Sequence, residues 1–144
     1  MKVFKFGGAS VKDAAGVKNL SSIVHQQHGQ LIVVVSAMGK TTNLLETLCN
    51  AYFHQDPKTT AIMKELKNFH LDIVNTLFPL NDTIHKHLEE LFTSLENILA
   101  SESSLCYDYE YDRIICFGEL ISTTIISDYL KMKGIENQFI DIRK

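Results

Sequence analysis

VFKFGGAS, at residues 3–10, is the part of this chain from which its architecture can be worked out. Its first four residues form a short apolar strand, and Gly7-Gly8 follow without a spacer. Paired glycines after a strand let the backbone turn and approach a ligand closely. Ser10 and Asp13 are placed to cap a helix that begins near residues 11–14. The stretch therefore predicts a strand, a glycine turn and a helix N-terminus whose free N–H groups and dipole are directed at one point.

The glycine turn has two interpretations. Lys5 places a cation just before it, and with the backbone N–H groups this predicts a phosphate cradle. Gly-Gly after a strand is also often only a turn, and the local residues favour the two interpretations equally. The lysine adds support for the cradle, because a strand-end lysine between apolar residues otherwise prefers open solvent.

The composition is ordinary for a soluble globular domain. The 144 residues are 45% hydrophobic and 22% charged with a net charge of -3, which suffices for one domain with its own core. The absence of a basic run argues against nucleic acid as a partner. With no apolar stretch of bilayer length and no signal peptide, we expect a cytoplasmic protein with no membrane partner. Three widely spaced cysteines and six ungrouped histidines predict buried thiols and no metal site.

A strand–helix–strand unit opens the chain. Apolar residues recur with a helical period over residues 13–28, and Gly29 is placed to end that helix. LIVVV at residues 31–35 is typical of a parallel strand buried on both faces. In a right-handed crossover both strands end at one sheet edge, where ligands of open α/β sheets bind. SAMGKTTN at residues 36–43 should therefore lie beside Gly7-Gly8, either as a second ligand loop or as a polar loop that caps the next helix.

The rest of the chain is predicted to be mainly helical. Gly39-Lys40-Thr41 is not a Walker A loop, because that motif needs a glycine where Val34 stands. A helix is expected over about residues 43–53, and two amphipathic stripes between about residues 57 and 100 predict an inserted antiparallel helical hairpin. A further helix is expected to begin near residues 113–118 and to be followed by a strand at 138–142.

Glu119 stands in the segment FGELIS, which is predicted to open that last helix. A glutamate in a first turn offsets the helix dipole by roughly 0.3–1 kcal/mol and needs no further function. The alternative is that Glu119 pairs with a substrate ammonium, with Gly118 allowing close approach. For a substrate carboxylate the chain offers only Arg113 and Arg143. Arg143 is the better placed, although a solvated terminal residue is its more ordinary interpretation.

Three segments together resemble the aspartate kinases of the amino-acid kinase family. They are KFGGASV at 5–11, VVSA at 34–37 with TNLL at 42–45, and the stretch from GEL at 118–120 to DIR at 141–143. The resemblance follows the family order over nearly the whole chain, and the helical pair corresponds to the family's insertion. It implies an α/β chain: the N-terminal portion of the three-layer αβα, carbamate-kinase-like amino-acid-kinase fold, with an inserted helical hairpin. Ala9 replaces the family's threonine, so a hydroxyl beside the glycines is lost.

The resemblance implies an enzyme that transfers the γ-phosphoryl group of ATP to the side-chain carboxylate of L-aspartate, the first step of lysine, threonine and methionine biosynthesis. It assigns the ATP site to Lys5, Phe6, Gly7, Gly8 and Ser36, with Lys5 as the catalytic cation. It assigns aspartate binding to Thr42 and Glu119. The family's Mg²⁺ is held largely by the nucleotide phosphates, so no residue is assigned to a metal.

The family's catalytic domain extends beyond the counterpart of Lys144 and is followed by regulatory ACT domains. We therefore expect residues 1–144 to be the N-terminal part of a catalytic domain, inactive alone and homo-oligomeric in the complete protein. One alternative is another phosphotransferase of this fold, acting on glutamate, N-acetylglutamate or a nucleoside monophosphate. A second alternative is a non-catalytic binding or assembly module.

Overall fold

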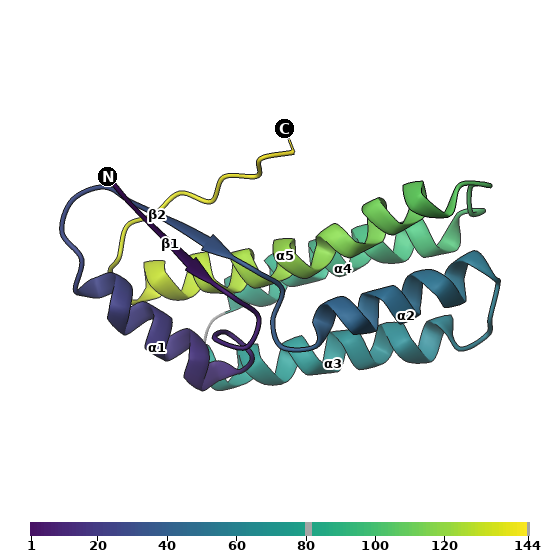
Figure 1. Ribbon diagram of the computed structural model, residues 1–144. Coiled ribbons are helices and arrows are strands. Elements are labelled where there is room, and N and C mark those ends of the chain that lie inside the picture. Colours follow the sequence, from purple (N-terminus) through teal and green to yellow (C-terminus); the bar gives the residue numbers. More distant parts are fainter. Residues whose placement is uncertain (80–81, 144) are drawn as a thin grey trace.

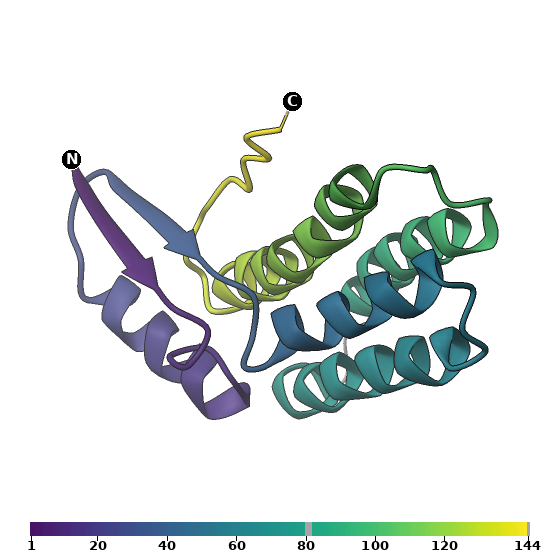
Figure 2. The ribbon, with the colours of Figure 1, turned by 45° about the vertical axis from the view of Figure 1, so that its right-hand side comes forward.

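The computed structural model describes residues 1–79 and 82–143. A two-stranded parallel sheet lies at one end of the molecule, with one helix packed beside it and four helices extending away as a bundle (Figures 1 and 2). In chain order the elements are β1 (Lys2–Phe6), α1 (Ala14–His25), β2 (Leu31–Val35), α2 (Thr41–Phe53), α3 (Thr59–Leu77), α4 (Asp82–Ala100) and α5 (Tyr107–Met132).

The β1–α1–β2 crossover is confirmed. The two strands pair in parallel, with Lys2 opposite Leu31 and Phe6 opposite Val35. The Asp13 carboxylate accepts a hydrogen bond from the Gly16 N–H at 2.8 Å, so Asp13 is the N-cap that begins α1. Both strands therefore end at one edge of the sheet, as the sequence predicts.

The prediction that Leu31–Val35 is buried on both faces is wrong. Val3 is 61% exposed, and Ile32 and Val34 are each 46% exposed. These three side chains share one face of the sheet, since side chains alternate along a strand. The opposite face packs on the core through Phe6, Leu31, Val33 and Val35. The apolar run of Leu31–Val35 indicates that this strand could be covered on both faces of the sheet. In the described chain, however, no element lies over the face that carries Val3, Ile32 and Val34.

The helical hairpin is confirmed as α3 and α4, which run in opposite directions, with α3 below α2 and α4 behind α5 in the view of Figure 1. Helix α2 packs on both α3 and α5, and α4 packs on α5. Of the three cysteines predicted to be buried, only Cys49 is. Cys106 lies exposed before α5, and Cys116 is half-buried. Within the described residues, no helix combines the length and apolarity needed to cross a membrane.

Helix α5 begins at Tyr107, well before the predicted start near residues 113–118. The polar run at the start of this helix has no apolar helical period, so the sequence pattern did not indicate a helix there. Its acidic residues nevertheless stabilise the first turn. Glu110 is fully buried there and accepts hydrogen bonds from the Ser104 N–H at 2.7 Å and the Arg113 guanidinium at 3.0 Å. Gly118 and Glu119 consequently lie in the middle of a helix of 26 residues and not in its first turn.

The predicted strand at residues 138–142 is also absent from the structure. The backbone after Gly134 is irregular, and Phe139, Ile140 and Ile142 are exposed. A strand forms only where a neighbouring strand accepts its hydrogen bonds, and among the described residues β1 and β2 pair only with each other.

Candidate functional site at the carboxyl edge of the sheet

The loops that follow β1 and β2 are joined to each other by hydrogen bonds. The Ser36 N–H donates to the Phe6 carbonyl at 3.0 Å, and the Gly39 N–H donates to the Gly8 carbonyl at 3.0 Å. Within the first loop the Ser10 N–H donates to the Gly7 carbonyl at 2.9 Å and closes a tight turn. The expectation that residues 36–43 lie beside Gly7-Gly8 is therefore confirmed.

The two glycines of the first loop have different physical requirements. A Cβ on Gly8 would lie 2.6 Å from the Ala37 carbonyl oxygen, so only glycine permits this approach of the two loops. A Cβ on Gly7 would meet no atom within 4 Å. Neither glycine has a positive φ. Gly8 is thus required by packing, whereas nothing in the described chain requires Gly7, and the space beside it is open.

The third sequence segment reaches the same place through α5. A Cβ on Gly118 would lie 2.9 Å from the Ala37 Cβ and 3.1 Å from the Leu45 Cδ1. Ala37 therefore lies between Gly8 of the first loop and Gly118 of α5. Helix α5 crosses the second loop and α2 closely because Gly118 has no side chain, and this contact places the exposed Glu119 near the carboxyl edge.

The predicted site residues differ in how they are held. Lys5 is exposed, and no hydrogen bond or ion pair joins it to the described residues. The Phe6 side chain packs against the core, and its backbone carbonyl accepts the Ser36 N–H. Ser36 is half-buried directly after β2, and Thr42 is exposed in the first turn of α2.

The start of α2 departs from the sequence expectation in one respect. Its N-cap is Lys40, which makes no side-chain capping hydrogen bond, so the alternative in which residues 36–43 serve as a polar loop that caps this helix is wrong. Thr41 is instead buried, and its Oγ1 lies 3.3 Å from the Nε2 of His70 in α3. The fully buried His70 also bonds the Leu66 carbonyl through Nδ1 at 2.8 Å, and burial lowers its pKa to about 4.

Sequence reasoning missed the His70–Thr41 pair, because the two residues are 29 positions apart. The one sequence signal was that His70 falls within the apolar stripe of its helix, where an unpartnered imidazole would be costly.

Arg143 is held by Asp141 at 2.7 Å and donates to the Cys116 Sγ at 3.0 Å, one turn before Glu119 on α5. Asp141 raises the pKa of this guanidinium.

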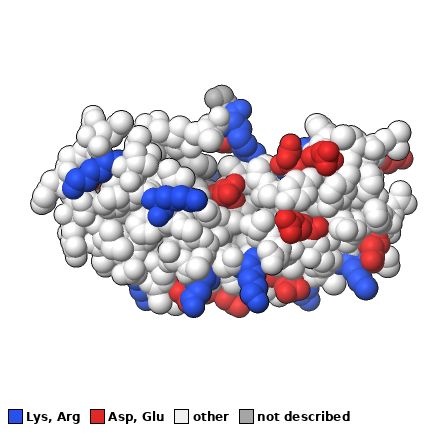
Figure 3. Space-filling view, in the orientation of Figure 1, with Lys and Arg blue, Asp and Glu red and all other residues white. Residues whose placement is uncertain are grey.

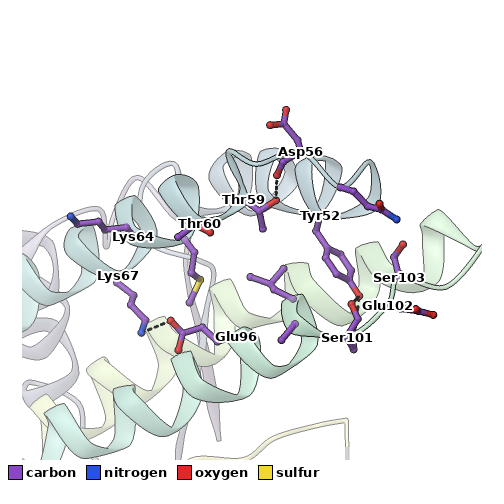
Figure 4. A pocket seen from close by; sticks show the side chains of 14 residues that line it. Tyr52, Asp56, Thr59, Thr60, Lys64, Lys67, Glu96, Ser101, Glu102 and Ser103 are labelled. Carbon is purple, nitrogen blue, oxygen red and sulfur yellow. Dashed lines mark hydrogen bonds and ion pairs between the residues drawn. The ribbon is translucent and has the colours of Figure 1, made fainter.

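Charge is unevenly distributed on the face shown in Figure 3, with single Lys or Arg side chains over the strands and acidic side chains grouped over the helical end. No cluster of three or more His, Cys, Asp or Glu within the described ranges could hold a metal ion. A groove of about 840 Å³ lies at the far end of the bundle, between the α2–α3 connection and the end of α4 (Figure 4). None of the predicted site residues lines it.

The parallel β1–α1–β2 unit, with its joined loops, defines an α/β protein whose candidate site lies at the carboxyl edge of the sheet. The chain belongs to the amino acid kinase family, whose model matches residues 1–144. It is 32% identical to aspartokinase 2, chloroplastic, of Arabidopsis thaliana over 139 residues, covering 92% of this chain and 25% of that protein. It is 28% identical to lysine-sensitive aspartokinase 3 of Escherichia coli over 144 residues, covering 99% of this chain and 31% of that protein.

The structural comparison agrees with the sequence comparison. The crystal structure of E. coli aspartokinase III in complex with aspartate and ADP matches all of this chain and 32% of its own, with a TM-score of 0.87 and 26% identity. Clostridium acetobutylicum aspartate kinase matches 91% of this chain and 29% of its own, with a TM-score of 0.69 and 25% identity. The predicted fold, the N-terminal portion of the amino-acid-kinase fold, is confirmed. The chain spans about a quarter to a third of the length of these relatives.

Proposed function

We propose that this chain supplies the phosphate-binding loop and part of the aspartate site of an aspartate kinase. In this proposal residues 1–144 form the N-terminal part of the catalytic domain, and the reaction transfers the γ-phosphoryl group of ATP to the side-chain carboxylate of L-aspartate. The observation that carries the proposal is the meeting of three segments at Ala37, between Gly8 and Gly118. Those are the segments in which the chain resembles aspartate kinases.

The first loop is suited to bind phosphate groups. The N–H groups of Gly8 and Ala9 donate to no acceptor within residues 1–79 and 82–143, and the space beside Gly7 is open. Lys5 adds a cation that no described carboxylate neutralises. Unpaired N–H groups and a free ammonium stabilise the charge that develops on a transferring phosphoryl group. Ser36 is joined to the residue before this loop, because its N–H donates to the Phe6 carbonyl, and it completes the proposed ATP site.

The proposed roles of Thr42 and Glu119 concern the second substrate. A carboxylate with a pKa of about 3.9 is already ionised at neutral pH, so the reaction needs no general base and depends on positioning. Glu119 would repel the phosphates of ATP, whereas an ion pair with the ammonium of aspartate gives it a role that does not oppose the reaction. Thr42 presents an exposed hydroxyl from the first turn of α2.

Mg²⁺ is implied by the family resemblance, and the residues of the proposed ATP site suggest how it would be held. Lys5, Gly7, Gly8 and Ser36 include no carboxylate, so the nucleotide phosphates would supply most of the metal's oxygen ligands. The bound ion would neutralise phosphate charge during transfer. The protein's part would be to hold the nucleotide.

The proposal is tested first by isothermal titration of the chain, and of the complete gene product, with Mg-ATP and with L-aspartate. Binding of both ligands by the gene product is expected. Binding of neither would contradict the proposal and favour a non-catalytic module. Binding of a nucleoside monophosphate or N-acetylglutamate in preference to aspartate would instead favour another phosphotransferase of this family.

Kinetics of variants of the gene product test the residue roles. Lys5→Ala is expected to lower kcat by roughly 10²–10³, the scale of losing one preorganised charge stabiliser. Lys2→Ala is the matched control, because Lys2 lies at the opposite end of the same strand and bonds Gln27 at 2.9 Å. A kcat for Lys5→Ala close to that of the control would refute the assignment.

Glu119→Ala is expected mainly to raise the KM for aspartate, and Asp112→Ala, an exposed acid on the same helix, serves as its control. If Glu119→Ala changed only the KM for ATP, Glu119 would not be the partner of the substrate ammonium.

A further inference from the structure

A buried polar pair connects the helical hairpin to the second loop of the candidate site. His70 of α3 is 0% exposed and Thr41, the first residue of α2, is 2% exposed. A carbonyl oxygen can only accept a hydrogen bond, so the Nδ1–H of His70 donates to the Leu66 carbonyl at 2.8 Å. The Nε2 of the neutral ring then has no hydrogen and accepts from the Thr41 hydroxyl at 3.3 Å. The tautomer and the direction of both bonds follow from the Leu66 carbonyl.

Thr41 touches three parts of the molecule at once. Its N–H donates to the Met38 carbonyl at 3.0 Å within the loop, and its hydroxyl bonds His70 on α3. Its Cγ2 methyl group lies 3.5 Å from where a Cβ on Gly118 of α5 would stand. The orientation of this one side chain is therefore determined by the loop, by α3 and by α5 together, and Thr42 is the next residue in the chain.

The imidazole of His70 is itself held in place by its neighbours. It makes an edge-on contact with Phe69 of α3, with ring centroids 5.0 Å apart, and a tilted contact with Phe92 of α4 at 6.3 Å. Both helices of the hairpin thus surround the ring. A hydrogen bond fixes direction, whereas apolar packing alone would allow the start of α2 to slide or rotate.

Among the residues that the structure describes, no other side chain in the first turn of α2 is joined by a hydrogen bond to a neighbouring helix. The N-cap of α2, Lys40, makes no capping hydrogen bond. The threonine at the helix start, a residue type that commonly caps its own helix, uses its hydroxyl for the contact with α3 instead.

We propose that His70 is a positioning residue which, through its hydrogen bond to Thr41, sets the first turn of α2 and so places Thr42 and Ser36 relative to the Gly7-Gly8 loop. The hairpin is then a brace for the substrate side of the site. The kinetic consequence rests on the proposed aspartate kinase function, since Thr42 contacts aspartate only in that proposal. The placement of the loop does not rest on it.

The placement is tested by the backbone amide spectrum of the 144-residue chain. Thr41→Val and His70→Phe each remove one partner, and the two changes combined leave no buried polar group unsatisfied. Each single variant and the double variant should shift the amide signals of Thr42, Gly39 and Gly118. The control is Thr47→Val on the exposed side of α2, where the hydroxyl bonds only the Asn43 carbonyl at 2.9 Å. Its shifts should stay around residue 47.

The functional consequence is tested on the complete gene product. The double variant is expected to regain most of the thermal stability lost by the single variants. We nevertheless expect its KM for aspartate to remain raised about tenfold, with the KM for ATP within twofold of the unmodified protein. Thr41→Ser keeps the hydroxyl and should keep the aspartate KM.

If His70 and Thr41 contributed only to stability, the double variant would recover both its stability and its KM for aspartate. The amide spectrum and the kinetics together distinguish that role from positioning. A double variant with restored stability and an unchanged KM for aspartate would overturn the positioning role, as would amide shifts confined to the substituted residues. A gene product that transfers no phosphoryl group to aspartate would refute the proposed function, while the amide shifts at Thr42 and Gly39 would still decide whether His70 places the loop.

Discussion

Lowering the pH from 7.5 to 5 should destabilise this protein measurably through His70 alone. The imidazole is fully buried, and burial lowers its pKa from the usual 6.5 to about 4. Between these two values the unfolded chain binds a proton that the folded chain does not. The free energy of unfolding therefore falls as the pH drops below about 6.5, and the loss levels off near pH 4. The contribution is fully present above pH 6.5.

The size of the effect follows from the interval between the pKa of the unfolded chain and the working pH. From 6.5 to 5 is 1.5 pH units, and each unit corresponds to about 1.4 kcal/mol, so the expected loss from His70 is about 2 kcal/mol. The ring's neighbours, Phe69 and Phe92, carry no charge that could offset it. The described contacts of the ring offer no acidic partner to stabilise an imidazolium.

Urea unfolding at pH 7.5 and pH 5 measures this term when two variants are compared. His70→Gln keeps an acceptor for Thr41 and a donor for the Leu66 carbonyl but does not titrate. Its free energy of unfolding should fall about 2 kcal/mol less between the two pH values than that of the unmodified chain. The exposed His28, changed to Gln, is the control and should retain the full pH dependence. Equal pH dependence in His70→Gln and the unmodified chain would show that the buried ring is not the source.

Three further predictions concern the glycines and the first helix. Gly7→Ala should leave the urea midpoint unchanged but weaken Mg-ATP binding in titrations, because its Cβ would enter only open space. Gly8→Ala should lower both stability and binding, since its Cβ would lie 2.6 Å from the Ala37 carbonyl oxygen. Gly118→Val should lower the free energy of unfolding by roughly 1–3 kcal/mol, seen in urea unfolding, because its side chain has no room beside Ala37. Asp13→Ala should cost about 1 kcal/mol in the same assay, the usual value of a lost N-cap, and a smaller change would show that the Gly16 N–H finds another partner.

The sequence predicted the parts of the fold that depend on local pattern and chain direction. Residues 36–43 could be placed beside Gly7-Gly8 because two parallel strands joined by one crossover must end at the same edge. The helical hairpin could be predicted because two amphipathic stripes separated by a turn have few other ways to bury their apolar faces. The residues of both features lie close together in the chain.

Features that depend on tertiary neighbours were not predictable from the same signals. The start of α5 was missed because a polar, aromatic run resembles a loop until the buried pairing of Glu110 with Arg113 is known. The prediction of a strand at 138–142 was wrong because an apolar run does not show whether a neighbouring strand is there to pair with it. Gly7 and Gly8 look alike in sequence, and only the Ala37 carbonyl distinguishes a glycine required by packing from one that is not.

The position of Glu119 inside α5 changes how the proposed substrate site should be understood. A carboxylate in a first turn could be explained by the helix dipole, but Glu119 follows twelve residues of helix and gains no such stabilisation. Its position depends on the helix as a rigid body, and Gly118 of that helix packs so closely on Ala37 of the second loop that a Cβ on Gly118 would lie 2.9 Å from the Ala37 Cβ. The spacing between the proposed phosphate loop and the proposed ammonium partner is therefore set by the packing of Gly8, Ala37 and Gly118. Under the proposed function, a substitution that enlarges any of these three residues should change the relative placement of ATP and aspartate without touching either ligand.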